Sequence, residues 1–228
     1  MNDVSDSDMV STDERNRMLR RLIELGIALS SERDHNRLLE LILLETKRIA
    51  NADGGTLYLM ADDERSLSFA ILRNDTLDVA MGGTTGVAVP FPPLQLYDAE
   101  GTPNYTNVAT AVALNKMTVN IPNAYETETF DFSGTIKFDQ STGYRSMSFL
   151  TVPLLNKQDS VIGVLQLINA RAPDGTVIPF SPDIQPIIEA LTSQAAVALD
   201  NEMLFQGQRK LLDAFIELIA GAIDQKSA

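Results

Sequence analysis

Hydrophobic residues repeat with helical spacing at both ends of this chain. Near the N-terminus the intervals are four, three and four residues, which places the apolar side chains on one face of a helix; the members are Met18, Leu22, Leu25 and Leu29. Near the C-terminus the same intervals form the seam of a coiled coil; the members are Leu211, Phe215, Leu218 and Ala222. The two ends are therefore predicted to be helical.

Capping signals and loop residues set the limits of the expected helices. We expect a disordered tail over residues 1–11, an N-terminal helix over residues 12–33 and a second helix from Asp34 to Ala50. Ser181-Pro182-Asp183 is a start signal for a long C-terminal helix. If this helix continues to Lys226 it is roughly 70 Å long, which exceeds one domain and requires a second partner for its far half.

Between the helices the pattern changes to strands. Asn51–Gly55 is predicted to be a turn, followed by a strand over Thr56–Met60. Alternating apolar residues predict half-buried strands that contain Leu67, Phe69 and Ile71, and then Val87, Val89 and Phe91. Later segments predict a short helix over Asn107–Leu114, a strand over Met117–Ile121, and a hairpin of Ser148–Leu155 with Ser160–Asn169. The pattern favours an α+β fold, with a central antiparallel sheet covered on one face by helices from both ends.

Composition excludes several classes of function. The net charge of −13 argues against a nucleic-acid surface and against docking on anionic lipid. The N-terminus is acidic and no apolar run is long enough to span a membrane, so we expect a cytoplasmic protein. The chain has no cysteine and one histidine, which removes thiol nucleophiles and most metal centres. We expect no catalytic residue and no metal site, and hence a chain that is not itself an enzyme.

Three motifs stand in a fixed order along the chain. They are Asn120-Ile121-Pro122-Asn123-Ala124-Tyr125, Asp139-Gln140-Ser141-Thr142-Gly143-Tyr144-Arg145-Ser146 and Val161-Ile162-Gly163-Val164-Leu165-Gln166-Leu167-Ile168-Asn169. In this order the motifs resemble the GAF domain, the small-molecule sensor module of signalling proteins, over residues 34–201. They are similar to the branch found in cyclic-nucleotide phosphodiesterases, adenylyl cyclases and bacterial HD-GYP phosphodiesterases. The resemblance implies a GAF fold, with the terminal helices on one face of the sheet and a short helix plus loops over the other.

The resemblance also implies where a ligand would lie, namely between the sheet and the short helix. The ligand-binding positions that it assigns are Thr56, Asn107, Val108, Ala109, Thr110, Asp139, Thr142, Ser146 and Gln166. The implied ligand is a cyclic nucleotide or another small cytoplasmic molecule, and no cofactor is assigned. The N–H groups at the start of the short helix could bind a phosphate, and side-chain oxygens and amides could bind a sugar or a purine edge.

Structural roles compete with ligand binding at several of these positions. Asp139 and Thr142 could cap a loop or helix, Arg145 could hold that loop through Asp139 or Asp131, and Tyr144 could pack in the core. The family's glycines are replaced by Asn107 and Thr110, which restricts how closely backbone approaches a ligand. An insertion between Pro90 and Asn107 could also reshape the pocket.

The last segment, Leu211–Ala228, resembles the helix that leads into HD-GYP domains. We therefore expect residues 202–228 to be a linker helix to an output domain, and the chain to be the regulatory region of a metal-dependent phosphodiesterase of cyclic di-GMP. The leading hypothesis is a sensor that passes its ligand state through the terminal helices. The alternative is a ligand-free dimerisation or spacer module. A parallel homodimer through the terminal helices would bury the coiled-coil seam, unless that helix packs on the output domain instead.

Overall fold

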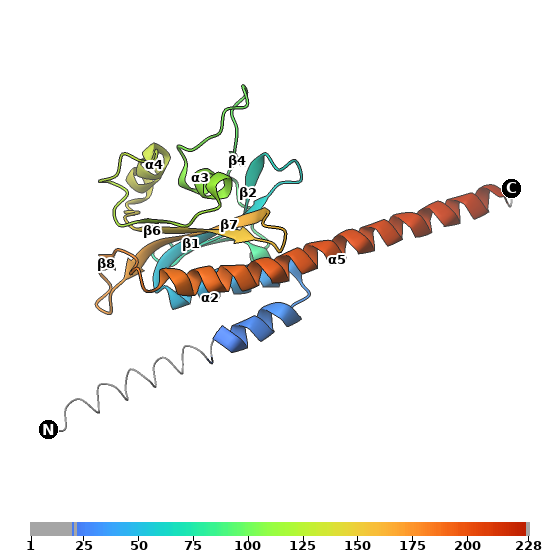
Figure 1. The fold of residues 1–228 in the computed structure, drawn as a ribbon, viewed down its shortest axis with the longest axis horizontal. Helices are drawn as coiled ribbons and strands as arrows, with labels where there is room; N and C mark the ends of the chain where they lie inside the picture. Colours follow the sequence, from blue (N-terminus) through green and yellow to red (C-terminus); the bar gives the residue numbers. More distant parts are fainter. Residues whose placement is uncertain (1–19, 21, 227–228) are drawn as a thin grey trace.

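The computed structural model of the chain describes residue 20 and residues 22–226. Figure 1 shows the fold as layers. A short helix, α3 (Val108–Asn115), and helix α4 (Ser133–Thr142) lie over one face of a sheet, while α2 (His35–Ile49) and the long α5 (Gln185–Lys226) cover the other. The helical residues 22–31 form an outer layer beyond α2 and α5. The α+β architecture and the distribution of helices on the two faces are as predicted.

The sheet has eight strands, all paired antiparallel. Its central path runs in the order β3-β2-β1-β7-β6-β5. β4 pairs with β2 at one side, and β8 pairs with β7. The bounds are β1 Ala52–Met60, β2 Ser66–Asn74, β3 Val79–Gly82, β4 Leu94–Gln95, β5 Val119–Ile121, β6 Phe149–Leu155, β7 Val161–Arg171 and β8 Val177–Ile178, with the 3₁₀ turn η1 at Gly83–Thr85.

The larger core lies between the sheet and the helices α2 and α5. Alternate residues of the central strands point into it, including Leu57, Leu165 and Leu167, each of which is completely buried. They meet apolar side chains of the two helices, such as Leu43 and Ile188. Burial of each such side chain is worth about 1.5 to 3 kcal/mol, so this face supplies much of the stability of the domain.

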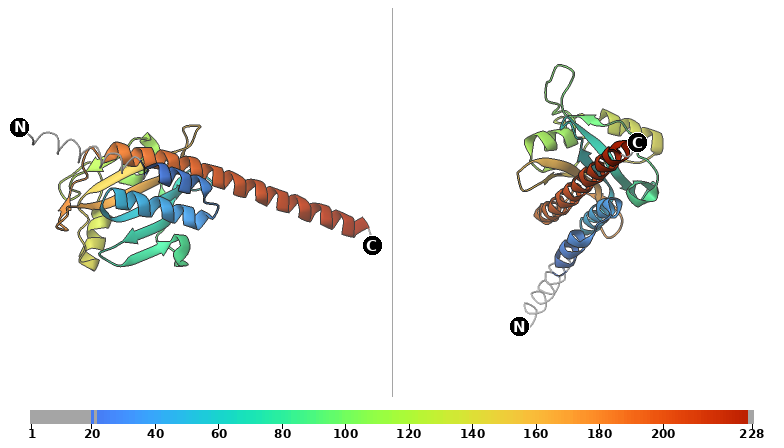
Figure 2. Two further views of the ribbon diagram at one scale, coloured as in Figure 1. Left: turned by 90° about the horizontal axis from the view of Figure 1, so that it is seen from below. Right: turned by 90° about the vertical axis from the view of Figure 1, so that its right-hand side faces the viewer.

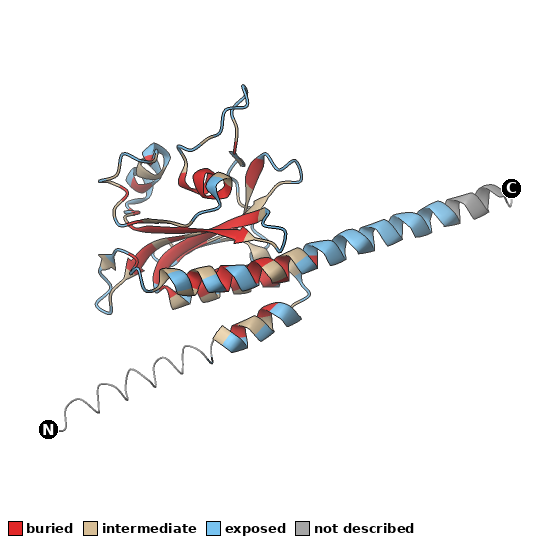
Figure 3. Ribbon diagram, viewed as in Figure 1, coloured by how far each residue is buried: buried red, intermediate tan, exposed pale blue. Residues whose placement is uncertain are grey.

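The smaller core lies on the opposite face, beneath α3. The intervening strand residues Tyr58, Val164 and Phe149 pack there against Val108 and Val112 of α3. The central strands are therefore buried on both faces, as Figure 3 shows by the red colour of the sheet. Because strand side chains alternate, neighbouring residues of β1 and β7 serve different cores.

Two strand predictions are wrong. Asn51–Gly55 is expected as a turn, yet all of it except Asn51 belongs to the buried strand β1. The glycines serve close packing here, since a Cβ on Gly55 would lie 2.8 Å from Cδ1 of Leu43 in α2. The expected strand through Val87, Val89 and Phe91 is irregular chain without strand pairing.

The alternation of Leu67, Phe69 and Ile71 is interrupted by a β-bulge. Leu57 pairs with Ile71 while the next residue, Tyr58, pairs with Phe69. The extra residue in β2 turns Ile71 towards the larger core, whereas Leu67 and Phe69 lie at the smaller one. A period of two in sequence therefore does not keep these side chains on one face of the sheet.

Helix α5 continues far beyond the domain that it covers. It is 42 residues long, about 63 Å at 1.5 Å per residue. Glu202 is its last buried residue among those whose burial is described, and its carboxylate lies 2.6 Å from Nδ1 of His35 at the start of α2. Figure 2 shows the rest of the helix extending away from the domain.

The expected N-terminal helix is present over residues 22–31, whereas the tail and Met18 lie outside the described residues. Leu25 and Leu29 are buried in the larger core of their own domain, so they are not available to a second chain. The exposed apolar side chains of this helix are Ile23 and Ile27. Within the described ranges, no helix is both long and apolar enough to span a membrane.

The contact between β7 and β1 predicts a sensitive glycine. A Cβ at Gly163 would lie 2.5 Å from the carbonyl oxygen of Tyr58, which backbone pairing holds in place. Gly163→Ala is expected to lower the free energy of unfolding by about 1 to 3 kcal/mol, measured by urea denaturation. Gly134→Ala in α4, where nothing lies within 4 Å, is the matched control and should not destabilise. Equal stability of the two variants would contradict this packing.

Candidate functional site

A row of polar side chains crosses the three central strands on the face beneath α3. Thr56 of β1 lies opposite Gln166 of β7, and Gln166 lies opposite Thr151 of β6. Thr56 and Thr151 are buried, while Gln166 is half-buried. Their neighbours on this face are the apolar and aromatic residues of the smaller core. Polar groups at the centre of such a surface need partners, because burying them unpaired is costly.

Hydrogen bonds connect this row. The amide of Gln166 donates to Oγ1 of Thr151 at 3.2 Å, and the hydroxyl of Tyr58 donates to Oε1 of Gln166 at 3.3 Å. Burial raises the pKa of the Tyr58 phenol, so it stays protonated and remains a donor. The first distance is at the long end of the usual N–H···O range, and the second exceeds the usual O–H···O range. A ligand that pairs with Gln166 would therefore displace weak bonds.

Aromatic rings extend from this row towards the edge of the sheet. The rings of Tyr58 and Phe69 have centroids 4.8 Å apart, and those of Phe69 and Phe91 are 5.3 Å apart. Phe91 belongs to the insertion between Pro90 and Asn107, whose Leu96 is buried in the smaller core. The insertion thus packs over this side of the polar row.

The start of α3 is already capped by a side chain. Oδ1 of Asn107 accepts hydrogen bonds from the backbone N–H groups of Ala109 at 2.9 Å and Thr110 at 3.3 Å. The hydroxyl of Thr110 donates to the carbonyl oxygen of Asn104 at 2.6 Å. Val108 and Ala109 are buried in the smaller core. The expected phosphate site at this helix start is therefore occupied by the protein's own cap.

Asp139 lies on the helix α4 and not on the expected loop over the sheet. Its buried carboxylate accepts from the hydroxyl of Tyr125 at 2.6 Å, and from the N–H and hydroxyl of Ser146 at 2.7 and 2.9 Å. The hydrogen bond with Asp139 raises the pKa of the Tyr125 phenol, which therefore remains protonated. These contacts join α4 to the chain segments before and after it. Asp139 therefore has the structural role that competed with ligand binding in the sequence analysis.

Thr142 and Arg145 have local partners as well. Thr142 is exposed at the last position of α4, and its hydroxyl donates to the carbonyl oxygen of Phe138 at 2.9 Å. The guanidinium of Arg145 lies 4.3 Å from the centroid of the Tyr125 ring. Among the ion pairs of the described residues, none joins Arg145 to Asp139 or Asp131, so the structural alternative offered by the sequence takes the form of this ring contact.

A second polar network secures the segment after α4. The buried carboxylate of Asp53 accepts from the hydroxyls of Tyr144 at 2.5 Å and Thr76 at 2.8 Å, and Arg171 lies 2.6 Å away. Asn169 donates to the hydroxyl of Tyr144 at 2.9 Å. Burial and Asp53 both raise the pKa of Tyr144. Tyr144 is thus a structural residue, which is the alternative to ligand binding that the sequence offered. Its carboxylate partner, Asp53, was not predicted.

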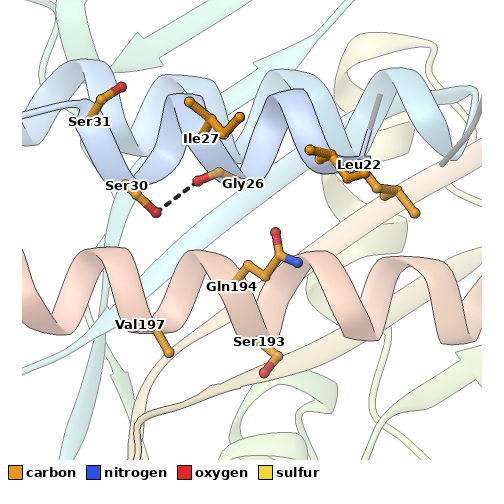
Figure 4. A pocket seen from close by; sticks show the side chains of 9 residues that line it. Leu22, Gly26, Ile27, Ser30, Ser31, Ser193, Gln194 and Val197 are labelled. Carbon is orange, nitrogen blue, oxygen red and sulfur yellow. Dashed lines mark hydrogen bonds between the residues drawn. The ribbon is translucent and has the colours of Figure 1, made fainter. Parts of the chain in front are cut away.

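One hollow of the surface lies on the helical side. An open groove of about 680 Å³ separates residues 22–31 from α5 and is lined by Leu22, Gly26, Gln194 and Val197, among others (Figure 4). The described part of the chain has no group of three or more His, Asp or Glu side chains placed to hold a metal ion.

The nine predicted positions therefore separate into three groups and one isolated residue. Thr56 and Gln166 meet in the polar row, Asn107 to Thr110 form a capped helix start, and Asp139 with Ser146 forms a closed pair. Thr142 stands apart at the surface. Sequence reasoning missed Tyr58 and Thr151, because their place beside Gln166 depends on strand register, which alternation alone does not give.

Comparison with known proteins places this fold in a family. Residues 34–199 match the GAF domain. The chain is 27% identical over 208 residues to a dual 3',5'-cyclic-AMP and -GMP phosphodiesterase 11A of Takifugu rubripes, covering 90% of this chain and 21% of that protein. A cGMP-specific 3',5'-cyclic phosphodiesterase of Drosophila ananassae is 27% identical over 191 residues, with 81% of this chain and 15% of the relative covered. The chain thus spans about a fifth or less of these relatives' length.

A solved structure has the same fold. The GAF domain of an Acinetobacter phosphoenolpyruvate-protein phosphotransferase aligns with a TM-score of 0.57 and 17% identity, covering 83% of this chain and 96% of that one. At this identity the likeness concerns the fold alone. With the family match spanning most of the chain, the conclusion is plain: this protein belongs to the GAF domain family of regulatory sensor modules.

Proposed function

We propose that this chain is a small-molecule sensor whose ligand binds over the sheet at Thr56 and Gln166. The observation that carries the proposal is the polar row of Thr56, Gln166 and Thr151 in the middle of an otherwise apolar face. Gln166 is the half-buried member, and its amide can both donate and accept hydrogen bonds. A polar group with this position can orient a ligand that the aromatic side chains Tyr58 and Phe69 flank.

A cyclic mononucleotide, cAMP or cGMP, is the ligand that we propose for the first titrations. Two relatives are named as phosphodiesterases of cAMP and cGMP, or of cGMP, which supports this class. Purine edges present donors and acceptors that an amide matches. The cap at Asn107 means that a phosphate would compete with a side chain for Ala109 and Thr110 N–H groups. Within this proposal the purine base therefore pairs with the amide of Gln166, and the N–H groups at the start of α3 contribute less to binding.

The central strands provide a route for the signal. Gln166 lies between Leu165 and Leu167, both of which pack in the core that contains α5. A shift of β7 at Gln166 therefore also moves contacts to α5. We propose that α5 carries this change to a C-terminal output domain, a phosphohydrolase of the HD-GYP type acting on cyclic di-GMP. The likeness of Leu211–Ala228 to the helix before such domains supports this choice.

A ligand-free dimerisation or spacer module is the second candidate. Two observations favour it. The start of α3, which was expected to bind ligand, is capped by a side chain, and Asp139 and Ser146, which were also expected to bind ligand, are hydrogen-bonded within the protein, with Tyr125 as a further partner of Asp139. In this alternative the polar row only fixes strand register. The two candidates differ in one property, since a spacer binds no nucleotide.

Gln166 provides the direct test of binding. If cAMP or cGMP pairs with its amide, Gln166→Ala should weaken binding by about 1 to 3 kcal/mol, measured by isothermal titration calorimetry. Gln158→Ala is the matched control, because Gln158 is exposed in the turn between β6 and β7. Absence of heat with both nucleotides and the wild-type protein would contradict the cyclic-nucleotide site. Equal affinities of the two variants would remove Gln166 from it.

Asp139 and Thr142 are expected to differ in stability. Asp139→Ala removes the acceptor of three hydrogen bonds and leaves the buried N–H of Ser146 unpaired, so the free energy of unfolding should fall by about 2 to 4 kcal/mol. Thr142→Ala at the exposed end of α4 should change it by less than about 0.5 kcal/mol. Chemical denaturation measures both. A stable Asp139→Ala protein with weakened nucleotide binding would instead favour a ligand contact.

We also propose that two copies of the chain pair in parallel through α5. Leu211, Phe215 and Leu218 are 59 to 74% exposed, and a second chain would remove them from water. Sedimentation equilibrium should show a dimer at tens of micromolar, and Phe215→Glu with Leu218→Glu should shift it to monomer. A monomeric wild type, or a double variant that is still fully dimeric, would contradict the pairing.

A further inference from the structure

A strap of irregular chain, residues 88–93, crosses the β2 side of the face that α3 covers. The strap has no regular secondary structure, and no described residue forms a hydrogen bond with its backbone. Both ends are fixed: before the strap the carbonyl oxygen of Val87 accepts from the N–H of Gly82 at 2.7 Å, and after it Leu94 pairs with β2. The residues between these two points are therefore held by side-chain contacts.

Phe91 is the anchor of the strap. Its ring centroid lies 5.3 Å from that of Phe69 on β2, although 41% of Phe91 is exposed. Val89 is half-buried, and the other residues of the strap are exposed. None of them belongs to the smaller core beneath α3. The contact between Phe91 and Phe69 is therefore the main attachment of the strap to the sheet.

The contacts of Phe91 continue inwards to the proposed ligand site. Phe69 is half-buried, and its ring centroid lies 4.8 Å from that of Tyr58, which is buried. The hydroxyl of Tyr58 in turn donates to Oε1 of Gln166 at 3.3 Å. These side chains form an aromatic path that runs from the surface, across β2 and β1, to the polar row. Phe91 lies at the outer end of this path.

The other segments over this face are attached more firmly than the strap. Helix α3 is buried along most of its length, and Asn107 caps its start. Asp139 joins α4 to Tyr125 and Ser146 by hydrogen bonds of 2.6 to 2.9 Å. The strap has neither buried core residues nor hydrogen bonds of this kind. It is therefore the part of the cover that opens most readily.

Three prolines make the strap stiff. Pro90, Pro92 and Pro93 fix their own φ at about −65° and favour extended backbone at the residue before each of them. A proline also has no N–H group, so movement of the strap into water leaves no proline donor without a partner. These properties favour displacement of the strap as one unit that carries Phe91 away from Phe69.

We infer that Phe91 is the gate of the proposed ligand site, past which a small planar ligand enters and leaves when the strap moves off Phe69. The inference rests on the proposed sensor function and specifies the route to its site. Aromatic rings give a planar base an apolar surface along the path, and the amide of Gln166 supplies a donor and an acceptor at the inner end. Closure of the strap over a bound ligand excludes water from the polar row and slows release of the ligand.

Removal of the gate tests the route by kinetics. Phe91→Ala should make both association and dissociation of N-methylanthraniloyl cAMP or cGMP at least about tenfold faster, while the dissociation constant changes by less than about threefold. Stopped-flow fluorescence measures both rates. Phe138→Ala is the matched control, because Phe138 on α4 is also 41% exposed. Faster dissociation with unchanged association would make Phe91 an ordinary ligand contact and contradict the gate.

A buried thiol tests the gate without any nucleotide. The chain has no cysteine, so Thr56→Cys places a single thiol at the inner end of the path, where Thr56 is 3% exposed. Its reaction with Ellman's reagent should be at least about tenfold faster when combined with Phe91→Ala, and unchanged when combined with Phe138→Ala. Thr151→Cys gives the same comparison if Thr56→Cys does not fold. Equal reaction rates in the two alanine backgrounds would overturn the gate.

The two measurements separate the gate from the proposed sensor function. Faster thiol reaction with Phe91→Ala, without binding of cAMP or cGMP to the wild-type protein, would contradict the nucleotide proposal and leave the gate in place. Nucleotide binding with equal rates in both alanine variants would overturn the gate alone. Circular dichroism and urea denaturation of the same variants show whether a faster reaction comes from opening of the strap or from loss of the fold, and a fully unfolded Phe91→Ala protein would contradict the gate.

Discussion

A single sheet buried on both faces is the constraint on which the rest of this structure depends. Leu57, Leu165 and Leu167 of the central strands pack on α2 and α5, while Thr56 and Gln166 between them face α3. Because the same two strands carry both sets, the position of Gln166 cannot change without altering contacts to the long helix. Gly55 allows β1 to approach Leu43 of α2 closely, and Gly163 allows β7 to approach the backbone of β1 at Tyr58. In the sensor that we propose, these strands are themselves the connection between the ligand and α5.

The sequence is informative where one local pattern determines the outcome. The second helix, predicted over Asp34–Ala50, is observed at His35–Ile49 with Asp34 as its cap, and the short helix predicted over Asn107–Leu114 lies at Val108–Asn115. Prediction fails where distant residues decide. Gly54 and Gly55 suggest a turn until Leu43 and Asn74 are packed against them, and α4 was expected as a loop. The bulge that turns Ile71 away from Phe69 has no signal in its own strand.

The candidate site shows the same division. The family resemblance assigned Thr56 and Gln166, and the register of β1 with β7 places them opposite one another. Their partners Tyr58 and Thr151 follow only from the sheet. Asp139 and Asn107 have the residue types of ligand contacts, yet the same oxygens satisfy N–H and hydroxyl groups of the protein. A sequence shows which side chains can form hydrogen bonds. Only the fold shows which of these side chains already form them with other groups of the protein.

Hydrogen–deuterium exchange of the wild-type protein, with and without cAMP or cGMP, tests the central claim that the α3 face binds ligand and passes the change to α5. The account predicts slower exchange in β7 and α3 on addition of one nucleotide, together with altered exchange over residues 185–202 of α5. Unchanged exchange throughout the domain at saturating nucleotide would contradict ligand binding. Slower exchange confined to β7 and α3, with α5 unaltered, would contradict the transmission of the signal.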